Sequence, residues 1–313
     1  MTTMRLAIAG GAQGDLNNLR SDGRWAMTDV RSVAGIGPEK AGLSARGQER
    51  ASLPALLVSY YYLDGFLKHQ PRYRYRDWAL DSGAFSAHNS GKTIKLQDYI
   101  DTCKRLMDTD PTLSEIFALD VIGDWRATLK NTEEMHRQGV PAIPAVHRGA
   151  PEQAIKAAAE YPKLAIGGVA RLKPSVRRKF IEQVFARVWP HAVHGFGIND
   201  EATVLAFPWH SVDASSWEFG PCAFGRWKAY GNMSVRGSIQ DLAPEINWYL
   251  DLEQRARAKW KKQMRQLEQG PNSVRFAWAG GVGCRNDTFA GPTVRLAEDS
   301  TGLTRQKFQE PNS

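Results

Sequence analysis

Short apolar segments that each end in a polar or flexible residue recur along this chain. Three of them end in aspartate, at Asp81, Asp120 and Asp213, a fourth ends at His147, and a fifth ends at the pair Gly167 and Gly168. A parallel strand buried on both faces reads as a continuous apolar run. In barrels of parallel strands, catalytic groups sit at the carboxyl ends of several different strands. The spacing therefore predicts one site that holds three carboxylates and one imidazole.

The same segments predict the fold class. Helical patterns lie between most of the apolar segments, and strict alternation of strand and helix favours a parallel sheet. Eight such units favour an α/β fold of the (β/α)8 TIM-like barrel type. A doubly wound open sheet is the alternative. The strands are expected at residues 5–11, 54–60, 78–81, 115–120, 142–147, 164–168, 191–197 and 210–213.

The domain organisation follows from where the strands end. Residues 1–240 are expected to form the catalytic barrel, including a long polar excursion at 12–50 of the kind that is usually functional or mobile. Residues 241–270 have the longest uninterrupted helical pattern, which predicts a basic C-terminal helix packed on or beside the barrel. Residues 271–313 are polar and predict an irregular tail.

Composition narrows the classes of function. The chain has 313 residues and a formal net charge of +8, which favours a polyanionic partner. Its three cysteines, Cys103, Cys222 and Cys284, are far apart, and no pair of its histidines has metal-binding spacing, so no metal site is expected. Reduced thiols, with neither a signal peptide nor a membrane span, predict a cytoplasmic protein.

Two aspartates are the candidate catalytic residues. A carboxylate such as Asp213 at the end of a strand can attack a sugar carbon, although a metal ligand or a helix cap are other interpretations. Asp81 precedes small residues that leave space for a ligand, although a tight turn would have the same pattern. Two carboxylates that face one pocket would differ in pKa and could divide acid and base roles.

The other strand-end residues suit recognition of a base. The carboxylate of Asp120 can accept two parallel hydrogen bonds, as from the edge of a guanine-like base. His147 can donate or accept at a ring edge, although a lone histidine is often structural. Gly167 and Gly168 can bring backbone N–H groups close to a ligand, or can form a plain strand-to-helix turn.

Basic residues mixed with aromatic ones predict a nucleic-acid surface, because phosphates attract cations and unstacked bases stack on aromatic rings. One group flanks Trp227, and a second lies on the predicted C-terminal helix, where a solvated helix face is the alternative. The candidate residues are Arg226, Lys228, Arg255, Lys259, Lys261 and Lys262.

At these residues the chain resembles the tRNA-guanine transglycosylase superfamily. Leu-Asp-Ser-Gly-Ala-Phe-Ser at 80–86 resembles its catalytic-aspartate motif, and Ala-Leu-Asp at 118–120 its base-recognition aspartate. Ala-Ile-Gly-Gly-Val at 165–169 resembles its Gly-Gly segment, and Ser-Val-Asp at 211–213 the segment with its nucleophile. The motifs occur in the family's order within residues 78–230.

Two departures point to one branch of that superfamily. The chain lacks the zinc site of three cysteines and one histidine that the tRNA enzymes carry after the nucleophile, and His147 stands near the position of a glutamine. The segment after Asp213, with Phe-Gly-Arg at 224–226, is closer to the DNA-modifying 7-deazaguanine transglycosylases (DpdA type) of phages and bacteria. The resemblance thus favours DNA over tRNA as the substrate.

The resemblance implies a two-step exchange of guanine in DNA for a free 7-deazaguanine base, such as 7-cyano-7-deazaguanine. Asp213 would attack C1′ and Asp81 would transfer protons to and from the bases. Asp120, His147 and the glycines would hold the base, with Ser82 and Phe85 as further substrate-binding candidates. No cofactor is implied, a homodimer is compatible, and a phage protein would act in the host cytoplasm. The alternatives are exchange on tRNA and a non-catalytic nucleic-acid-binding barrel within a modification complex.

Overall fold

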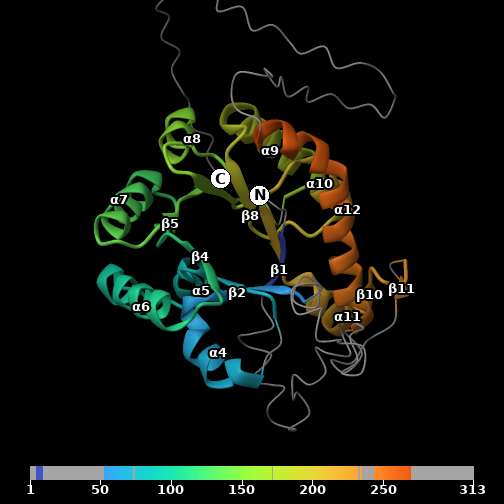
Figure 1. The fold of residues 1–313 in the computed structure, drawn as a ribbon, viewed down its shortest axis with the longest axis horizontal. Helices are drawn as coiled ribbons and strands as arrows, with labels where there is room; N and C mark the ends of the chain where they lie inside the picture. Colours follow the sequence, from blue (N-terminus) through green and yellow to red (C-terminus); the bar gives the residue numbers. More distant parts are fainter. Residues whose placement is uncertain are drawn as a thin grey trace, which may run out of the picture. The chain divides into compact units, whose positions relative to one another are not determined.

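The chain forms an α/β fold in which parallel strands are surrounded by helices (Figure 1). The computed structural model describes residues 5–9, 53–72, 75–170, 172–231, 233–234 and 243–268. All of these belong to one compact unit, Met1–Ser273. The excursion expected at 12–50 and the tail expected at 271–313 lie outside the described residues.

The expected strands are confirmed at all of their positions, with one of them divided in two. They form a sheet of nine strands in the order β5-β4-β3-β2-β1-β9-β8-β7-β6, and every pairing in it is parallel. The strands are β1 (Arg5–Ala9), β2 (Ala55–Ser59), β3 (Trp78–Asp81), β4 (Leu113–Phe117), β5 (Ala142–Ile143), β6 (Ala145–His147), β7 (Lys163–Gly167), β8 (Ala192–Gly195) and β9 (Ser211–Ala214).

The two halves of the divided strand, β5 and β6, stand at opposite ends of this order. β5 and β6 are separated only by Pro144, which has no N–H group to donate to a neighbouring strand. The carbonyl of Ile143 accepts a hydrogen bond from Ala118 beyond β4, and the carbonyl of Pro144 accepts one from Ala165 in β7. One short segment thus bonds to a different strand on each side.

The two faces of the sheet are packed differently, because successive side chains of a strand point to opposite faces. One face meets the helices in a cluster that includes Val58, Trp78 and Leu80. The other face carries a smaller cluster in which residues of β2, β3 and β4 pack against residues of β5, β6 and β7. Strands from both halves of the order therefore share one interior.

Helices connect the strands, and several begin at residues suited to capping. The Asp124 side chain accepts hydrogen bonds from two amides of α7, and Asp200 accepts one at the start of α10. The helices are α4 (Leu63–His69), α5 (Ala84–Asn89), α6 (Leu96–Thr109), α7 (Trp125–Arg137), α8 (Glu152–Ala158), α9 (Pro174–Val188), α10 (Glu201–Ala206), α11 (Ser216–Phe224) and α12 (Ala243–Glu268), with 3-10 turns at Tyr60–Tyr62 and Gln70–Arg72. A hairpin of β10 (Arg226–Trp227) and β11 (Met233–Ser234) follows α11.

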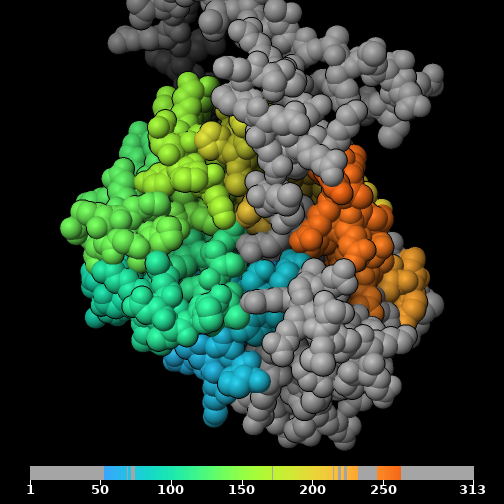
Figure 2. Space-filling view, viewed as in Figure 1, coloured from blue at the N-terminus to red at the C-terminus, as the bar shows by residue number. Residues whose placement is uncertain are grey.

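The long basic helix predicted near the C-terminus is α12, and it packs on the rest of the fold. Its buried residues Ile246, Tyr249, Leu252 and Ala256 recur at helical spacing and form one face. The helix contacts β1, α10 and α11, and its outer face, orange in Figure 2, lies on the surface. Within the described residues, no helix combines the length and apolar composition needed to cross a membrane.

Candidate active site

Three aspartates converge at the carboxyl ends of strands that are distant in sequence. Asp81 is the last residue of β3, Asp120 lies just beyond β4, and Asp213 lies in β9. The charges of Asp120 and Asp213 both act on the carboxyl group of Asp81. The structure therefore brings together the three carboxylates that the sequence singled out.

Asp81 has a carboxyl group that resists ionisation. Burial raises its pKa to about 7, and the charges of Asp120 and Asp213 contribute in the same direction. Backbone N–H groups of Gly83 and Ser82 oppose the rise, and the Gly83 nitrogen lies 3.0 Å from Oδ2. A carboxyl group with this pKa can both donate and accept a proton near neutral pH.

The turn after Asp81 depends on a glycine. Gly83 has φ +72°, and a Cβ atom there would lie 2.7 Å from both Oγ of Ser59 and the backbone nitrogen of Tyr61. The turn is therefore held against the end of β2. Of the other residues predicted here, Ser82 is buried, whereas the Phe85 side chain on α5 is 59% exposed. Phe85 is thus not a core residue.

Asp120 and His147 form a hydrogen-bonded pair. Nε2 of His147 lies 2.9 Å from Oδ2 of Asp120. Burial disfavours the charged imidazolium, but the hydrogen bond to Asp120 and the charges of Asp120 and Asp81 outweigh it and raise the pKa of His147. The second carboxylate oxygen of Asp120, Oδ1, is buried and has no hydrogen-bond partner among the described residues. A buried acceptor of this kind is costly unless something supplies a donor.

The glycine pair lies against the same imidazole. Gly167 is the register partner of His147, and a Cβ atom on Gly167 would come within 2.6 Å of Nδ1 and Cε1 of the ring. The following Gly168 has φ +69° and is exposed. The ring thus occupies the space that any other side chain at 167 would need.

Asp213 lies beside two groups, one from β8 and one from the turn that follows it. The backbone N–H of Gly197 donates to Oδ1 of Asp213 over 2.8 Å. Nε2 of His194 lies 3.4 Å from the same oxygen, and Nδ1 of His194 lies 2.8 Å from Oγ of Ser211. Asp213, His194 and Ser211 are all buried.

His194 and Ser211 are site residues that our sequence reasoning missed. The signal was available in the spacing, because Ser211 and Asp213 are two residues apart on one strand and so share a face. His194 stands within its strand, and its spacing from the other histidines indicated no metal site. Its pairing with Ser211 follows from the register of β8 against β9, which the sequence does not give.

The candidate nucleic-acid-binding residues have different surroundings. Arg226 is exposed on β10, and Lys259 and Lys261 are exposed on α12. Arg255 forms ion pairs with Glu201 and Asp251. The Lys262 side chain lies outside the described part of the structure.

Lys228 points inward rather than toward solvent. Its Nζ donates to the backbone carbonyl of Asn199 and to the hydroxyl of Tyr249, and it lies 5.1 Å from the ring centroid of Trp248. Burial lowers its pKa to about 8. In this conformation the amine joins α12 to the segment before α10.

In the described part of the chain, no group of three or more His, Cys, Asp or Glu side chains is arranged to hold a metal ion. Cys103 is buried in the cluster between sheet and helices, and burial raises its pKa to about 12. That thiol is therefore a core residue and not a nucleophile.

The site thus has three carboxyl groups with different surroundings. Asp81 is half-buried and can donate or accept a proton, Asp213 accepts a backbone hydrogen bond, and Asp120 has one buried oxygen without a partner among the described residues. Comparison with known proteins adds no family assignment, since the chain matches no protein-family model and no curated protein sequence.

Proposed function

We propose that the parallel strands close into a (β/α)8 barrel, with β5 and β6 as two halves of one strand. Counting these halves together turns the nine strands of the order into eight. The hydrogen bonds of Ile143 and Pro144 to opposite neighbours support closure, as does the interior cluster shared by β2 and β7. In such a barrel the three aspartates share one mouth, where catalytic groups of this fold lie.

On this scaffold we propose a DNA guanine transglycosylase that exchanges guanine for a 7-deazaguanine base. The observation that carries the proposal is the coupling of the carboxyl of Asp81, with a pKa of about 7, to Asp120 and Asp213. Exchange of one base for another needs one group that first gives a proton to the leaving base and then takes one from the incoming base. It also needs a nucleophile that holds the sugar between the two steps.

In the first half of the reaction, an oxygen of Asp213 attacks C1′ of the target nucleotide. The C1′–N9 bond breaks, its electron pair goes to the guanine, and the proton of Asp81 neutralises the departing base. The target base must leave the duplex stack before C1′ can be reached. Burial of Asp81 favours its protonated form before this step.

In the second half, Asp81 accepts a proton from the incoming base, whose nitrogen attacks C1′. The bond between C1′ and Asp213 breaks, and its electron pair returns to the carboxylate. Two inversions restore the original configuration at C1′, as in retaining glycosidases. These steps use the chain's own carboxyl groups for both displacement and proton transfer.

Recognition of the base is assigned to Asp120 and its neighbours. The unpaired Oδ1 of Asp120 can accept an N–H of a guanine edge, while His147 fixes Oδ2. The close approach of Gly167 to His147 limits motion of that imidazole. Both guanine and a 7-deazaguanine present the same N1–H and amino edge, so one recognition group serves both bases.

Three features support DNA as the polymer. The sequence resembles the DNA-modifying branch of the transglycosylase superfamily around Asp213, and it lacks the cysteine-rich zinc motif of the tRNA enzymes. The net charge of +8 and the exposed Arg226, Lys259 and Lys261 suit a phosphate backbone.

The first test is base exchange by the purified protein. DNA containing radiolabelled guanine is incubated with excess 7-cyano-7-deazaguanine, and the nucleosides are then analysed by mass spectrometry. We expect label to leave the DNA and the deaza-nucleoside to appear. tRNA is tested in parallel, and exchange on tRNA alone would contradict the choice of DNA.

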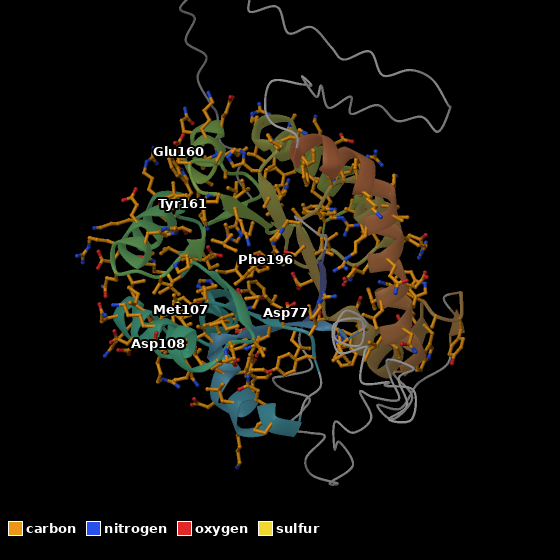
Figure 3. All side chains as sticks on the ribbon, viewed as in Figure 1. Asp77, Met107, Asp108, Glu160, Tyr161 and Phe196 are labelled. Carbon is orange, nitrogen blue, oxygen red and sulfur yellow. The ribbon has the colours of Figure 1, made fainter. Side chains whose placement is uncertain are left out.

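Matched variants separate catalysis from binding. Asp213→Ala should retain DNA binding and lose exchange, because it removes the nucleophile. Asp108→Asn, at an exposed carboxylate on α6 that is labelled in Figure 3, should leave both unchanged. If Asp213→Ala retained exchange, the covalent mechanism would be wrong. If the wild type bound DNA without exchange, the non-catalytic alternative would replace this proposal.

A further inference from the structure

Three polar side chains lie in a row in the interior, and the last of them is the proposed nucleophile, Asp213. Ser211 and Asp213 are two residues apart on β9 and therefore share a face. His194 on β8 is the register partner of Ser211. Its ring spans the gap, with Nδ1 2.8 Å from Oγ of Ser211 and Nε2 3.4 Å from Oδ1 of Asp213.

Aromatic packing holds the imidazole in this orientation. The ring centroid of His194 lies 4.6 Å from that of Phe117 and 4.6 Å from that of Phe196. Phe196, labelled in Figure 3, lies among the strands inside the surrounding helices. The His194 side chain is 3% exposed, so water does not compete for its nitrogens. The ring is thus positioned by packing and not only by its polar contacts.

The contacts favour one of the two tautomers of the His194 ring. A neutral histidine carries one N–H and one acceptor nitrogen, and the contact of one nitrogen decides the role of the other. If Ser211 donates its hydroxyl hydrogen to Nδ1, the ring proton resides on Nε2 and faces the Asp213 carboxylate. The opposite tautomer would direct a lone pair at that carboxylate, which is repulsive. Nε2 has no hydrogen-bond partner among the described residues, and it lies 3.4 Å from Oδ1 of Asp213.

We infer that His194 is a positioning residue for Asp213, with Ser211 selecting the tautomer that presents Nε2–H to the carboxylate. Together with the Gly197 N–H, which is 2.8 Å away, it fixes Oδ1 and leaves Oδ2 directed at C1′. This role rests on the proposed transglycosylase function, since it concerns the same nucleophile.

The inference has a specific consequence for the second half of the reaction. When the bond between Oδ2 and C1′ breaks, its electron pair returns to Asp213 and restores the carboxylate charge. N–H donors at Oδ1 stabilise that returning charge, as preorganised donors do for charge that develops in a transition state. Loss of the His194 donor should therefore slow release of the sugar from the enzyme, and the covalent intermediate should accumulate.

The tautomer can be measured without any assay of exchange. In protein labelled with 15N-histidine, the chemical shifts of the two ring nitrogens report which one carries the proton. His194→Phe identifies the signals by their loss and preserves an aromatic ring between Phe117 and Phe196. We expect the Nε2–H tautomer in the wild type and a loss of this preference in Ser211→Ala.

Kinetics then tests the effect on Asp213. We expect His194→Phe to lower kcat by about 10–100-fold with KM changed far less, because misplacing a reacting group by about 1 Å can cost roughly 100-fold. Mass spectrometry should show a larger fraction of glycosylated enzyme. Ser211→Ala should lower kcat by less, and it should have no further effect when added to His194→Phe. His194→Gln, which keeps an N–H donor, should recover part of the loss.

The outcomes separate this inference from the proposed function. An Nδ1–H tautomer in the wild type overturns the inference whether or not the protein exchanges bases. Full kcat in a folded His194→Phe overturns it as well, as do losses that multiply in the double variant. If the wild type exchanges no base on DNA or tRNA, the proposed function fails, and the ring-nitrogen shifts still decide whether Ser211 sets the tautomer.

Discussion

At the scale of single residues, the site depends on carboxyl groups that differ because their surroundings differ. Asp81 is half-buried near two other aspartates, Asp213 receives a backbone N–H, and Asp120 is paired with His147. The sequence predicted these residues because each follows an apolar run. It could not predict His194, since a histidine within a strand has no recognisable role until the strand's neighbour and register are known.

The raised pKa of Asp81 predicts how stability depends on pH. A carboxyl whose pKa is about 7 when folded and near 3.8 when unfolded stabilises the fold fully below pH 3.8, and that contribution is lost as the pH rises to about 7. Asp81→Asn should therefore be more stable than wild type at pH 8, by on the order of 3 kcal/mol, with the difference vanishing toward pH 4. Urea unfolding at several pH values measures this.

The control for that experiment is Asp108→Asn, because Asp108 is exposed. Its stability should follow that of the wild type at every pH. A pH-independent difference between Asp81→Asn and wild type would mean that Asp81 does not ionise in this range.

The kcat/KM for guanine release should also fall as the pH rises through about 7, because the proton donor is then lost.

At the scale of elements, the sequence of α12 predicted its helical structure better than it predicted the contacts of its charged side chains. The helix and its apolar face were predicted from spacing, and both are present. Arg255 is among the residues predicted to face nucleic acid, and it forms an ion pair with Glu201, while the neighbouring Arg257 pairs with Glu253. A charge run gives the sign of a helix face and does not say which cations have partners within the protein.

The ion pairs of Glu253 attach α12 to the segment before β3, and their contribution to stability can be predicted. Glu253 is nearly fully buried and lies 2.9 Å from Nη1 of Arg76, which precedes β3, as well as beside Arg257. Glu253→Gln should lower the free energy of unfolding by about 3 kcal/mol, because it removes a buried carboxylate that is paired with both Arg76 and Arg257. Asp251→Asn, at an exposed ion pair on the same helix, should cost at most about 0.5 kcal/mol. Equal effects in denaturant titrations would contradict this account.

At the scale of the whole molecule, apolar runs were enough to predict the parallel α/β fold, and turns and short elements were not. The Gly-rich motif after Asp81 includes a short helix, α5, that was not expected. α11 contains Pro221, a residue that usually ends a helix, and it forms nevertheless. The hairpin of β10 and β11 is too short for periodicity to detect.

The net charge of +8 gives a prediction for the molecule as a whole. If the outer face of α12 binds phosphates, reversing Lys259 and Lys261 to glutamate should weaken DNA binding. It should also reduce the slope of log Kd against log salt by about 2, since each phosphate contact contributes about 0.9. Lys68→Glu, at an exposed lysine on α4, is the control. An unchanged slope in the double variant would exclude α12 from the interface.

The position of Pro144 has a mechanical consequence. β5 and β6 stand at opposite ends of the strand order and are joined through one residue. Neither strand can therefore detach from its neighbour independently of the other. Force applied to detach β5 from β4 is transmitted at once to the contact between β6 and β7. The pairing of β5 with β4 and the pairing of β6 with β7 should therefore break in a single event, and not one after the other, when the protein is pulled between residues 117 and 163.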